Sequence, residues 1–161
     1  YTFIGKGTVR AFIKDLEHEA AVYERLKAVQ GISVPVFLGT VDLRSMNKIY
    51  YYDHRVYVVH LTFLSWGGYK LHDIVVNGTG KRFADGAMQS LRSIHRQGII
   101  HKDVRGANML FNPETNRVMI IDFERSLIVH PPRRALAQLV PNKRSWDHET
   151  TEKRKGGVRA S

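Results

Sequence analysis

The 161-residue sequence contains no cysteine. The absence of thiols excludes disulfides, thiolate metal sites and cysteine nucleophiles, and it favours an intracellular, cytoplasmic compartment, where disulfides are rare. Long apolar segments are missing too, because the longest one, residues 56–66, contains a histidine and is too short to cross a bilayer. No membrane span is therefore expected, and the first residues lack the charged-then-apolar pattern of a signal peptide.

Acidic residues are scarce relative to basic ones: 15 Asp and Glu stand against 25 Lys and Arg, for a net charge of +10. Such a surplus suits anionic partners, including nucleotides, nucleic acids and acidic membranes. Much of it lies in the last residues, and we interpret the Pro- and Arg-rich segment 131–161 as a solvated basic tail. A nuclear-targeting or nucleic-acid-binding patch is the alternative. Nucleic acid ranks last among partners because the sequence has no recognised nucleic-acid-binding motif.

The first half of the chain alternates between strand and helix patterns. Residues 1–8 predict a short strand that runs into a turn marked by two glycines. Apolar residues recur at helical spacing over 14–29, which predicts a helix that ends at Gly31 and is followed by extended chain around Pro35. Residues 49–64 form two β-rich runs about a polar "DHR" turn and predict a hairpin.

The second half begins at "SWGGY", residues 65–69, whose two glycines make it a candidate hinge. Helical spacing then predicts a second helix over 82–98 with Gly98 as its stop. A polar loop follows, and two short strands flank the turn "NPETN" before the second strand ends at Asp122.

This second hairpin brings polar groups together. Asn108 directly precedes its first strand and Asp122 directly follows its second, so antiparallel pairing places both at the same end. Asp103 lies in the same loop, five positions before Asn108 (108 − 103 = 5). Asp and Asn oxygens are ligands that Mg²⁺ takes when phosphates complete its shell, and a carboxylate that binds no metal can orient or deprotonate a hydroxyl.

The segments "HKDVRGANML" and "IIDFE" resemble the catalytic loop and metal-binding motif of the protein-kinase-like superfamily, H-R-D-x-x-x-x-N followed by D-F-G. The resemblance implies an α+β, two-lobe kinase-like fold within one domain, residues 1–161. A small β-rich lobe with one helix would occupy 1–64 and a hinge 65–68. A shortened helical lobe carrying the catalytic-loop hairpin would occupy 69–130.

The same resemblance implies roles for the matched residues, with ATP and Mg²⁺ as cofactors. Asp103 would orient the attacking hydroxyl or accept its proton, and Asn108 and Asp122 would hold Mg²⁺ against the nucleotide phosphates. His101 matches a histidine that we interpret as structural. Arg105 would contact a phosphoryl group, and a plain surface arginine is the alternative.

The small lobe should supply a lysine and a glutamate that pair over the phosphates. Glu19, on the first predicted helix, is the preferred glutamate. Lys6, thirteen residues before it, is the preferred lysine over Lys14, although Lys6 could also be a surface residue in a turn. The backbone of the hinge, at Leu64, Ser65 and Trp66, would bind adenine.

Three departures from the kinase pattern stand out. No G-x-G-x-x-G loop precedes Lys6, Glu124 replaces the final glycine of D-F-G, and no A-P-E element follows. The chain is therefore similar to atypical or truncated members, and the pattern "HEAAVYERL…QG…VPVFLG…LSWGG" favours fungal kinase-like proteins. The expected function is transfer of the ATP γ-phosphoryl group to a hydroxyl of a protein or small molecule; a catalytically impaired pseudokinase that binds partners as a scaffold is the alternative.

Overall fold

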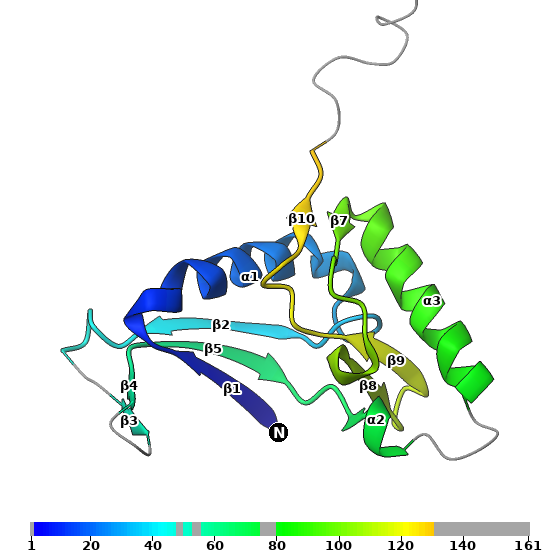
Figure 1. The fold of residues 1–161 in the computed structure, drawn as a ribbon, viewed down its shortest axis with the longest axis horizontal. Coiled ribbons are helices and arrows are strands. Elements are labelled where there is room, and N and C mark those ends of the chain that lie inside the picture. Colours follow the sequence, from blue (N-terminus) through cyan, green and yellow to red (C-terminus); the bar gives the residue numbers. More distant parts are fainter. Residues whose placement is uncertain (1, 48–49, 53–55, 75–79, 131–161) are drawn as a thin grey trace, which may run out of the picture. The chain divides into compact units, whose positions relative to one another are not determined.

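The structure, a computed structural model, describes residues 2–47, 50–52, 56–74 and 80–130 (Figure 1). The described residues up to Val129 form one compact unit. The predicted basic tail, residues 131–161, and the predicted "DHR" turn, residues 53–55, lie outside the described residues.

An antiparallel sheet in the order β1-β5-β2 forms the N-terminal part. It consists of β1 (Phe3–Thr8), β2 (Phe37–Asp42) and β5 (His60–Ser65). The predicted glycine turn within residues 1–8 is wrong, because β1 continues through Gly5 and Gly7 and pairs with β5 over its whole length. Lys6 therefore lies within a strand, opposite Thr62. Glycine avoids a clash at position 7, because an added Cβ would lie only 2.7 Å from the Val58 side chain.

The helix α1 (Ile13–Arg25) packs along this sheet against β2 and β5 (Figure 1). The predicted helix over 14–29 is confirmed for most of its length, but residues 27–29 tighten into a 3₁₀ turn. Gly31 has a positive φ of 75°, as expected for a residue that follows a helix end. The buried residues of α1 recur at helical spacing: Ile13, Leu16, Glu19, Val22 and Tyr23.

The predicted hairpin of residues 49–64 is divided between two sheets. Its first part forms the ribbon β3 (Tyr50–Tyr52) and β4 (Val56–Val58), which pair antiparallel. The chain then leaves this ribbon at Val59, whose N–H donates to the Thr8 carbonyl, and continues as β5 of the larger sheet.

The C-terminal part is built on a second sheet in the order β6-β8-β9. Its strands are β6 (Tyr69–Lys70), β8 (Met109–Asn112) and β9 (Arg117–Ile120), and a short helix, α2 (Leu71–Ile74), follows β6. The long helix α3 (Gly80–Arg96) packs against β9 and confirms the second predicted helix within two residues at each end. β7 (Ile99–Ile100) pairs with β10 (Leu127–Ile128).

Among the described residues, one hydrophobic cluster contains side chains from both parts. It contains Val22 of α1, Leu64 of β5, Phe83 of α3, Ile120 of β9 and Phe123, which follows β9. Elements on both sides of the glycine pair at 67–68 therefore share one buried cluster. None of the helices among the described residues is both long and apolar enough to cross a membrane.

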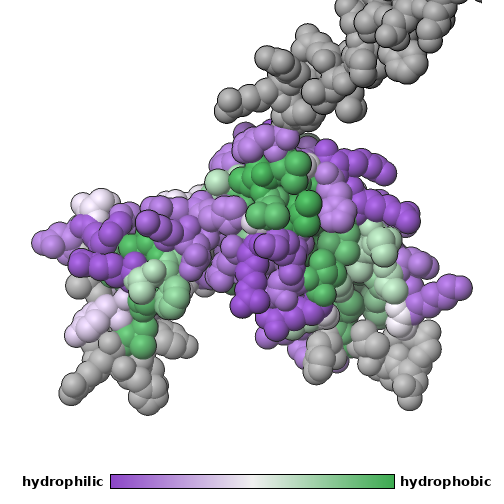
Figure 2. Space-filling model, turned by 45° about the horizontal axis from the view of Figure 1, so that its top comes forward, coloured by the Kyte–Doolittle hydropathy of each residue, from purple (hydrophilic) through white to green (hydrophobic). Residues whose placement is uncertain are grey.

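An apolar patch remains on the surface of the β7–β10 ribbon. Figure 2 shows the hydrophobic residues gathered there, and the half-exposed side chains in this ribbon and next to it are Ile100, Leu127 and Val129.

Gly68 fixes the connection between the two sheets. Its φ is +120°, and a Cβ there would lie 2.1 Å from the carbonyl oxygen of Phe111. A residue other than glycine would therefore meet both an unfavourable backbone conformation and the backbone of β8.

We expect Gly68→Ala to lower the free energy of unfolding by roughly 2–5 kcal/mol, because strain and overpacking add. Gly39 has a similar φ of +117° but no neighbour within 4 Å, so Gly39→Ala should show the strain alone, about 1–3 kcal/mol. Gly106 has neither problem, and Gly106→Ala should change stability by less than about 0.5 kcal/mol. Urea denaturation of the three variants tests the order, and equal losses at positions 39 and 68 would contradict the predicted clash.

Candidate functional site

A cavity of about 390 Å³ is lined by both parts of the fold. Small-molecule sites are concave, mostly apolar and supplied with a few placed polar groups, and this volume lies in their usual range. The N-terminal part contributes Ile4, Gly5, Lys6, Glu19, Pro35, Leu64 and Ser65. The C-terminal part contributes Gly67, Lys70, Ala107, Asn108, Leu110, Ile121 and Asp122.

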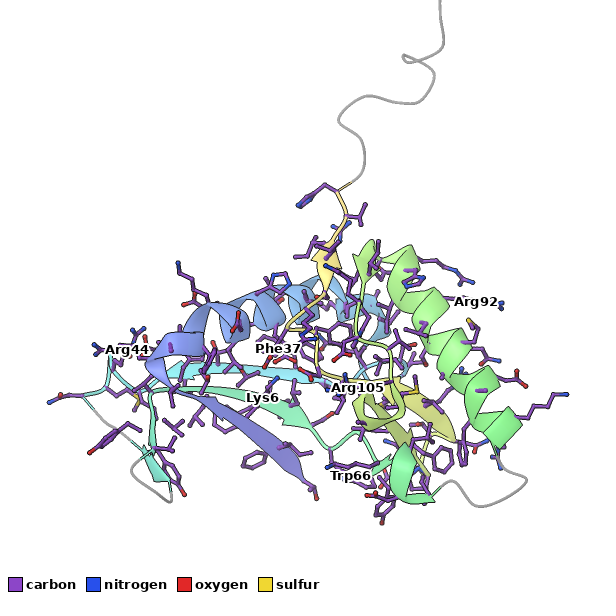
Figure 3. The ribbon with its side chains drawn as sticks, in the orientation of Figure 1. Lys6, Phe37, Arg44, Trp66, Arg92 and Arg105 are labelled. Atoms are coloured by element: carbon purple, nitrogen blue, oxygen red, sulfur yellow. The ribbon has the colours of Figure 1, made fainter. Side chains whose placement is uncertain are left out.

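Lys6 is the centre of the polar side of this cavity. Its Nζ lies 2.9 Å from Glu19 Oε2, 3.2 Å from Asp122 Oδ1 and 2.6 Å from Glu124 Oε1. Burial alone would lower the pKa of Lys6, but the charge of Glu19, hydrogen bonds to Glu124 and Glu19, and the charge of Asp122 raise that pKa above its ordinary value. The lysine is therefore firmly cationic, and Figure 3 shows it extending from β1.

Glu19 is the most deeply buried of these acids, with only 1% of its side chain exposed. Its second oxygen, Oε1, accepts a hydrogen bond from the Phe123 N–H at 3.0 Å. A buried carboxylate is costly unless it is paired and hydrogen-bonded, and both conditions are met here. Lys6, the preferred lysine, contacts this glutamate, whereas Lys14 is exposed on α1.

Asp122 follows β9 with a φ of +69°, which is uncommon for a residue other than glycine. The residues on both sides hold it in place: the Ile121 N–H donates to the Asn108 carbonyl at 3.0 Å, and the Phe123 N–H donates to Glu19. Strained backbone of this kind persists where the surroundings determine it, and it clusters at functional sites.

The loop before β8 is held by His101, which is fully buried. Its Nδ1 accepts from the Asp103 N–H at 3.2 Å, so Nε2 carries the proton and donates to the Ile121 carbonyl at 2.9 Å. Both ring nitrogens are thus used to attach the loop to the chain beside Asp122. This arrangement agrees with the structural interpretation of His101.

Asn108 and Asp122 both line the cavity, at the end of the β8–β9 hairpin that the spacing predicts. Asp103 lies beside them: Asn108 Nδ2 donates to its carbonyl oxygen at 3.0 Å and to its Oδ2 at 3.2 Å. Arg105 Nε lies 3.4 Å from the same Oδ2, while its side chain remains 62% exposed. The structure therefore brings Arg105 to Asp103 as an exposed cation.

The predicted adenine-binding residues separate into two groups. Leu64 and Ser65 line the cavity, whereas Trp66 (labelled in Figure 3) does not. Trp66 instead packs edge-on against Tyr69, with ring centroids 5.3 Å apart. The N–H groups of Ser65 and Trp66 donate to the carbonyls of Val36 and Thr2. Gly67, which was not among the predicted site residues, lines the cavity. Its N–H donates no hydrogen bond within the described residues.

A row of aromatic rings lies behind the charged groups. Phe37 stacks on Tyr23 at 5.9 Å, Tyr23 meets Phe123 edge-on at 5.4 Å, and Phe123 meets His101 at 4.8 Å. These rings come from β2, α1 and the two loops of the site, and they fix the spacing among these elements. Sequence reasoning missed the row, although the four-residue spacing of Glu19 and Tyr23 indicates that both face the core.

Glu124 is the second feature that sequence reasoning missed. From sequence it is only a substitute for a glycine, yet its carboxylate makes the shortest contact to Lys6. The only signal in the sequence is a charge two residues after a predicted metal ligand.

The site contains few protein groups for a metal ion. Among the described residues, no three or more His, Asp or Glu side chains gather in a way that could hold a metal by themselves. The Asn108 amide nitrogen donates to Asp103, and the Asn108 amide oxygen makes no hydrogen bond within the described residues. The Asp122 side chain is 34% exposed. One carboxylate and one amide oxygen fit Mg²⁺, which commonly takes its remaining ligands from phosphates and water.

Known proteins resemble this chain in sequence and in fold. No protein-family model matches the sequence. The sequence is 40% identical over 146 residues to the meiotic driver SPOK2 of Podospora anserina, a match that covers 89% of this chain and 18% of SPOK2. It is 28% identical over 132 residues to two probable cell division control protein 7 homologues of Encephalitozoon cuniculi, covering 74% of this chain and 37% of each homologue.

A solved structure, a crystal structure of an Stt7 homologue from Micromonas algae soaked with ATP, superposes with a TM-score of 0.62. The match is 18% identical and covers 78% of this chain and 43% of that one. At this identity the likeness shows the fold alone, and the fold is kinase-like. The chain spans less than half the length of each of these proteins.

The Glu19 contacts give a test of the geometry. Glu19→Ala removes the buried partner of Lys6 and leaves the Phe123 N–H without an acceptor, so we expect a loss of about 3 kcal/mol or more in the free energy of unfolding. Glu19→Gln keeps an oxygen for that N–H and should lose about half as much.

Glu17→Gln, an exposed position on the same helix, is the matched control and should stay within about 0.5 kcal/mol of wild type. Chemical denaturation gives all three values. If Glu19→Ala behaved like the control, the buried ion pair would contribute nothing to stability.

Proposed function

We propose that the chain binds ATP with Mg²⁺ and transfers the γ-phosphoryl group to a hydroxyl acceptor. The observation that carries the proposal is the convergence of Lys6, Asn108 and Asp122, from three separate stretches of sequence, on one cavity with Asp103 beside it. ATP is also the ligand named for the crystals of the Stt7 homologue, whose fold this chain shares.

In this proposal the N-terminal sheet with α1 acts as the small lobe, residues 65–68 as the hinge and residues 69–130 as the catalytic lobe. The base would lie among the apolar lining residues Ile4, Leu64, Leu110 and Ile121. Of the hinge residues, Ser65 and Gly67 line the cavity, and the Gly67 N–H is the available donor because that of Ser65 is already engaged. The phosphates would then face Lys6, whose raised pKa keeps the charge that they require.

Asn108 and Asp122 would hold the metal ion through the amide oxygen and the carboxylate. When bound, Mg²⁺ supplies positive charge that neutralises the phosphate oxygens as the phosphoryl group is transferred. Lys6 orients the phosphates, and Glu19 keeps Lys6 in position because its own place is fixed by the Phe123 N–H.

Asp103 is placed to act on the acceptor hydroxyl, either by orienting it or by taking its proton. Its Oδ2 is held by Asn108 and Arg105, while Oδ1 makes no hydrogen bond within the described residues. Arg105 is exposed and adjacent, so its guanidinium can serve an anionic phosphoryl group. A hydroxyl on a protein or on a small molecule satisfies these groups equally.

A catalytically impaired pseudokinase that binds partners is the second candidate. It is favoured by one contact, Glu124 to Lys6, which places an extra carboxylate among the groups proposed to bind phosphate. The two candidates differ in turnover, which a pseudokinase would lack. A pseudokinase would bind nucleotide as a kinase does only if Asn108 and Asp122 still hold the metal ion.

Nucleotide binding is tested by thermal stability with and without MgATP. At a ligand concentration of a hundredfold its dissociation constant, binding adds about 2.7 kcal/mol to the free energy of unfolding. We expect this gain in wild type and its near loss in Asp122→Asn, which removes the charged metal ligand. No gain in wild type would contradict the proposed nucleotide site.

Turnover is tested by Asp103→Asn, with ATP hydrolysis and phosphate transfer to mixed protein and small-molecule acceptors as the measurements. Loss of a general base typically lowers the rate by about 10²–10⁴-fold, and the MgATP stabilisation should remain because Asp103 does not line the cavity. Asp85→Asn on the exposed side of α3 is the matched control and should retain the wild-type rate. Wild-type binding without any Asp103-dependent turnover would favour the pseudokinase.

A further inference from the structure

Glu124 forms an ion pair with Lys6, the cation that the proposed function assigns to the phosphates. Its Oε1 lies 2.6 Å from Lys6 Nζ, closer than the oxygens of Glu19 at 2.9 Å and Asp122 at 3.2 Å. A lysine ammonium group has three N–H donors. Three carboxylates around one ammonium group leave no donor for a fourth anion.

The three carboxylates are not equally able to leave. Glu19 is buried and bound to the Phe123 N–H, and Asp122 is held by the backbone on both sides. Glu124 is 40% exposed, and within the described residues its side chain makes no hydrogen bond or ion pair other than the one to Lys6. It is therefore the carboxylate that an incoming phosphate can replace at the lowest cost.

Charge points to the same residue. One lysine and three carboxylates give this cluster a formal charge of −2 (1 − 3 = −2), so its carboxylates repel a phosphate group that approaches Lys6. Removal of Glu124 halves that charge and frees one donor of Lys6. Uncharged parts of a nucleotide, which would lie on the apolar lining, are unaffected by either change.

We infer that Glu124 is an internal competitor for the phosphate position at Lys6 and that it sets how tightly a nucleoside di- or triphosphate binds. The inference rests on the proposed nucleotide site and adds a residue to it. A bound phosphate displaces the Glu124 carboxylate toward solvent, so each phosphorylated ligand pays the cost of breaking the Glu124–Lys6 contact. Adenosine, which has no phosphate, does not.

The test is Glu124→Gln in the full chain, with binding of MgATP, MgADP and adenosine measured by calorimetry. We expect the dissociation constants of MgATP and MgADP to fall roughly threefold to tenfold, because a partly exposed ion pair and one unit of repulsion are removed. The dissociation constant of adenosine should not change. Glu114→Gln, in the exposed turn after β8, makes the same change in net charge away from Lys6 and should leave all three constants at their wild-type values.

The outcomes separate the inference from the proposed function. If wild type binds MgATP and Glu124→Gln binds it equally or more weakly, the competition is wrong and the nucleotide site stands. Equal tightening of adenosine and MgATP would also overturn it, because the effect would not depend on phosphate. If neither protein binds MgATP while both show wild-type unfolding transitions, the nucleotide site itself is wrong and the inference is overturned with it.

Discussion

The buried carboxylate of Glu19 is the constraint on which the rest of the site depends. Removing it from water is costly, and the cost is offset only because one oxygen meets Lys6 and the other meets the Phe123 N–H. These partners lie 13 and 104 residues away in sequence. A single desolvated group therefore holds β1, α1 and the chain after β9 in one arrangement, and the position of Asp122 follows from it.

The same helix face joins this charged group to the hydrophobic core. Tyr23 lies one turn after Glu19 and packs between Phe37 and Phe123, so one face of α1 carries both the ion pair and the aromatic row. Burial, together with the negative charges of Glu19 and Asp122, raises the pKa of Tyr23 well above its ordinary value, so this phenol stays neutral beside the acids. The site is thus joined to the closely packed core through Tyr23 and Phe123.

The sequence predicts the part of the site that is local. Asp103, Asn108 and Asp122 belong to one loop and one hairpin, so their spacing and a short antiparallel pairing suffice to place them. The strand position of Lys6 could not be read in this way, because two flanking glycines indicate a turn until pairing with Thr62, 56 residues later (62 − 6 = 56), is known. The contact between Glu124 and Lys6, and the exclusion of Trp66 from the cavity, likewise depend on tertiary packing that no local pattern contains.

Glu124 shows how one substitution can act through charge rather than through backbone freedom. From sequence, a Cβ at this position suggests a restriction of the backbone. Within the described residues, however, positive φ angles occur at Asp122 but not at Glu124, so the conformation at position 124 is one that any residue can adopt. The side chain changes the number of carboxylates that contact Lys6. A glycine at position 124 would leave two carboxylates beside the ammonium group, and glutamate makes three. The effect of this departure from the kinase pattern is therefore electrostatic, and it acts where the proposed phosphates would bind.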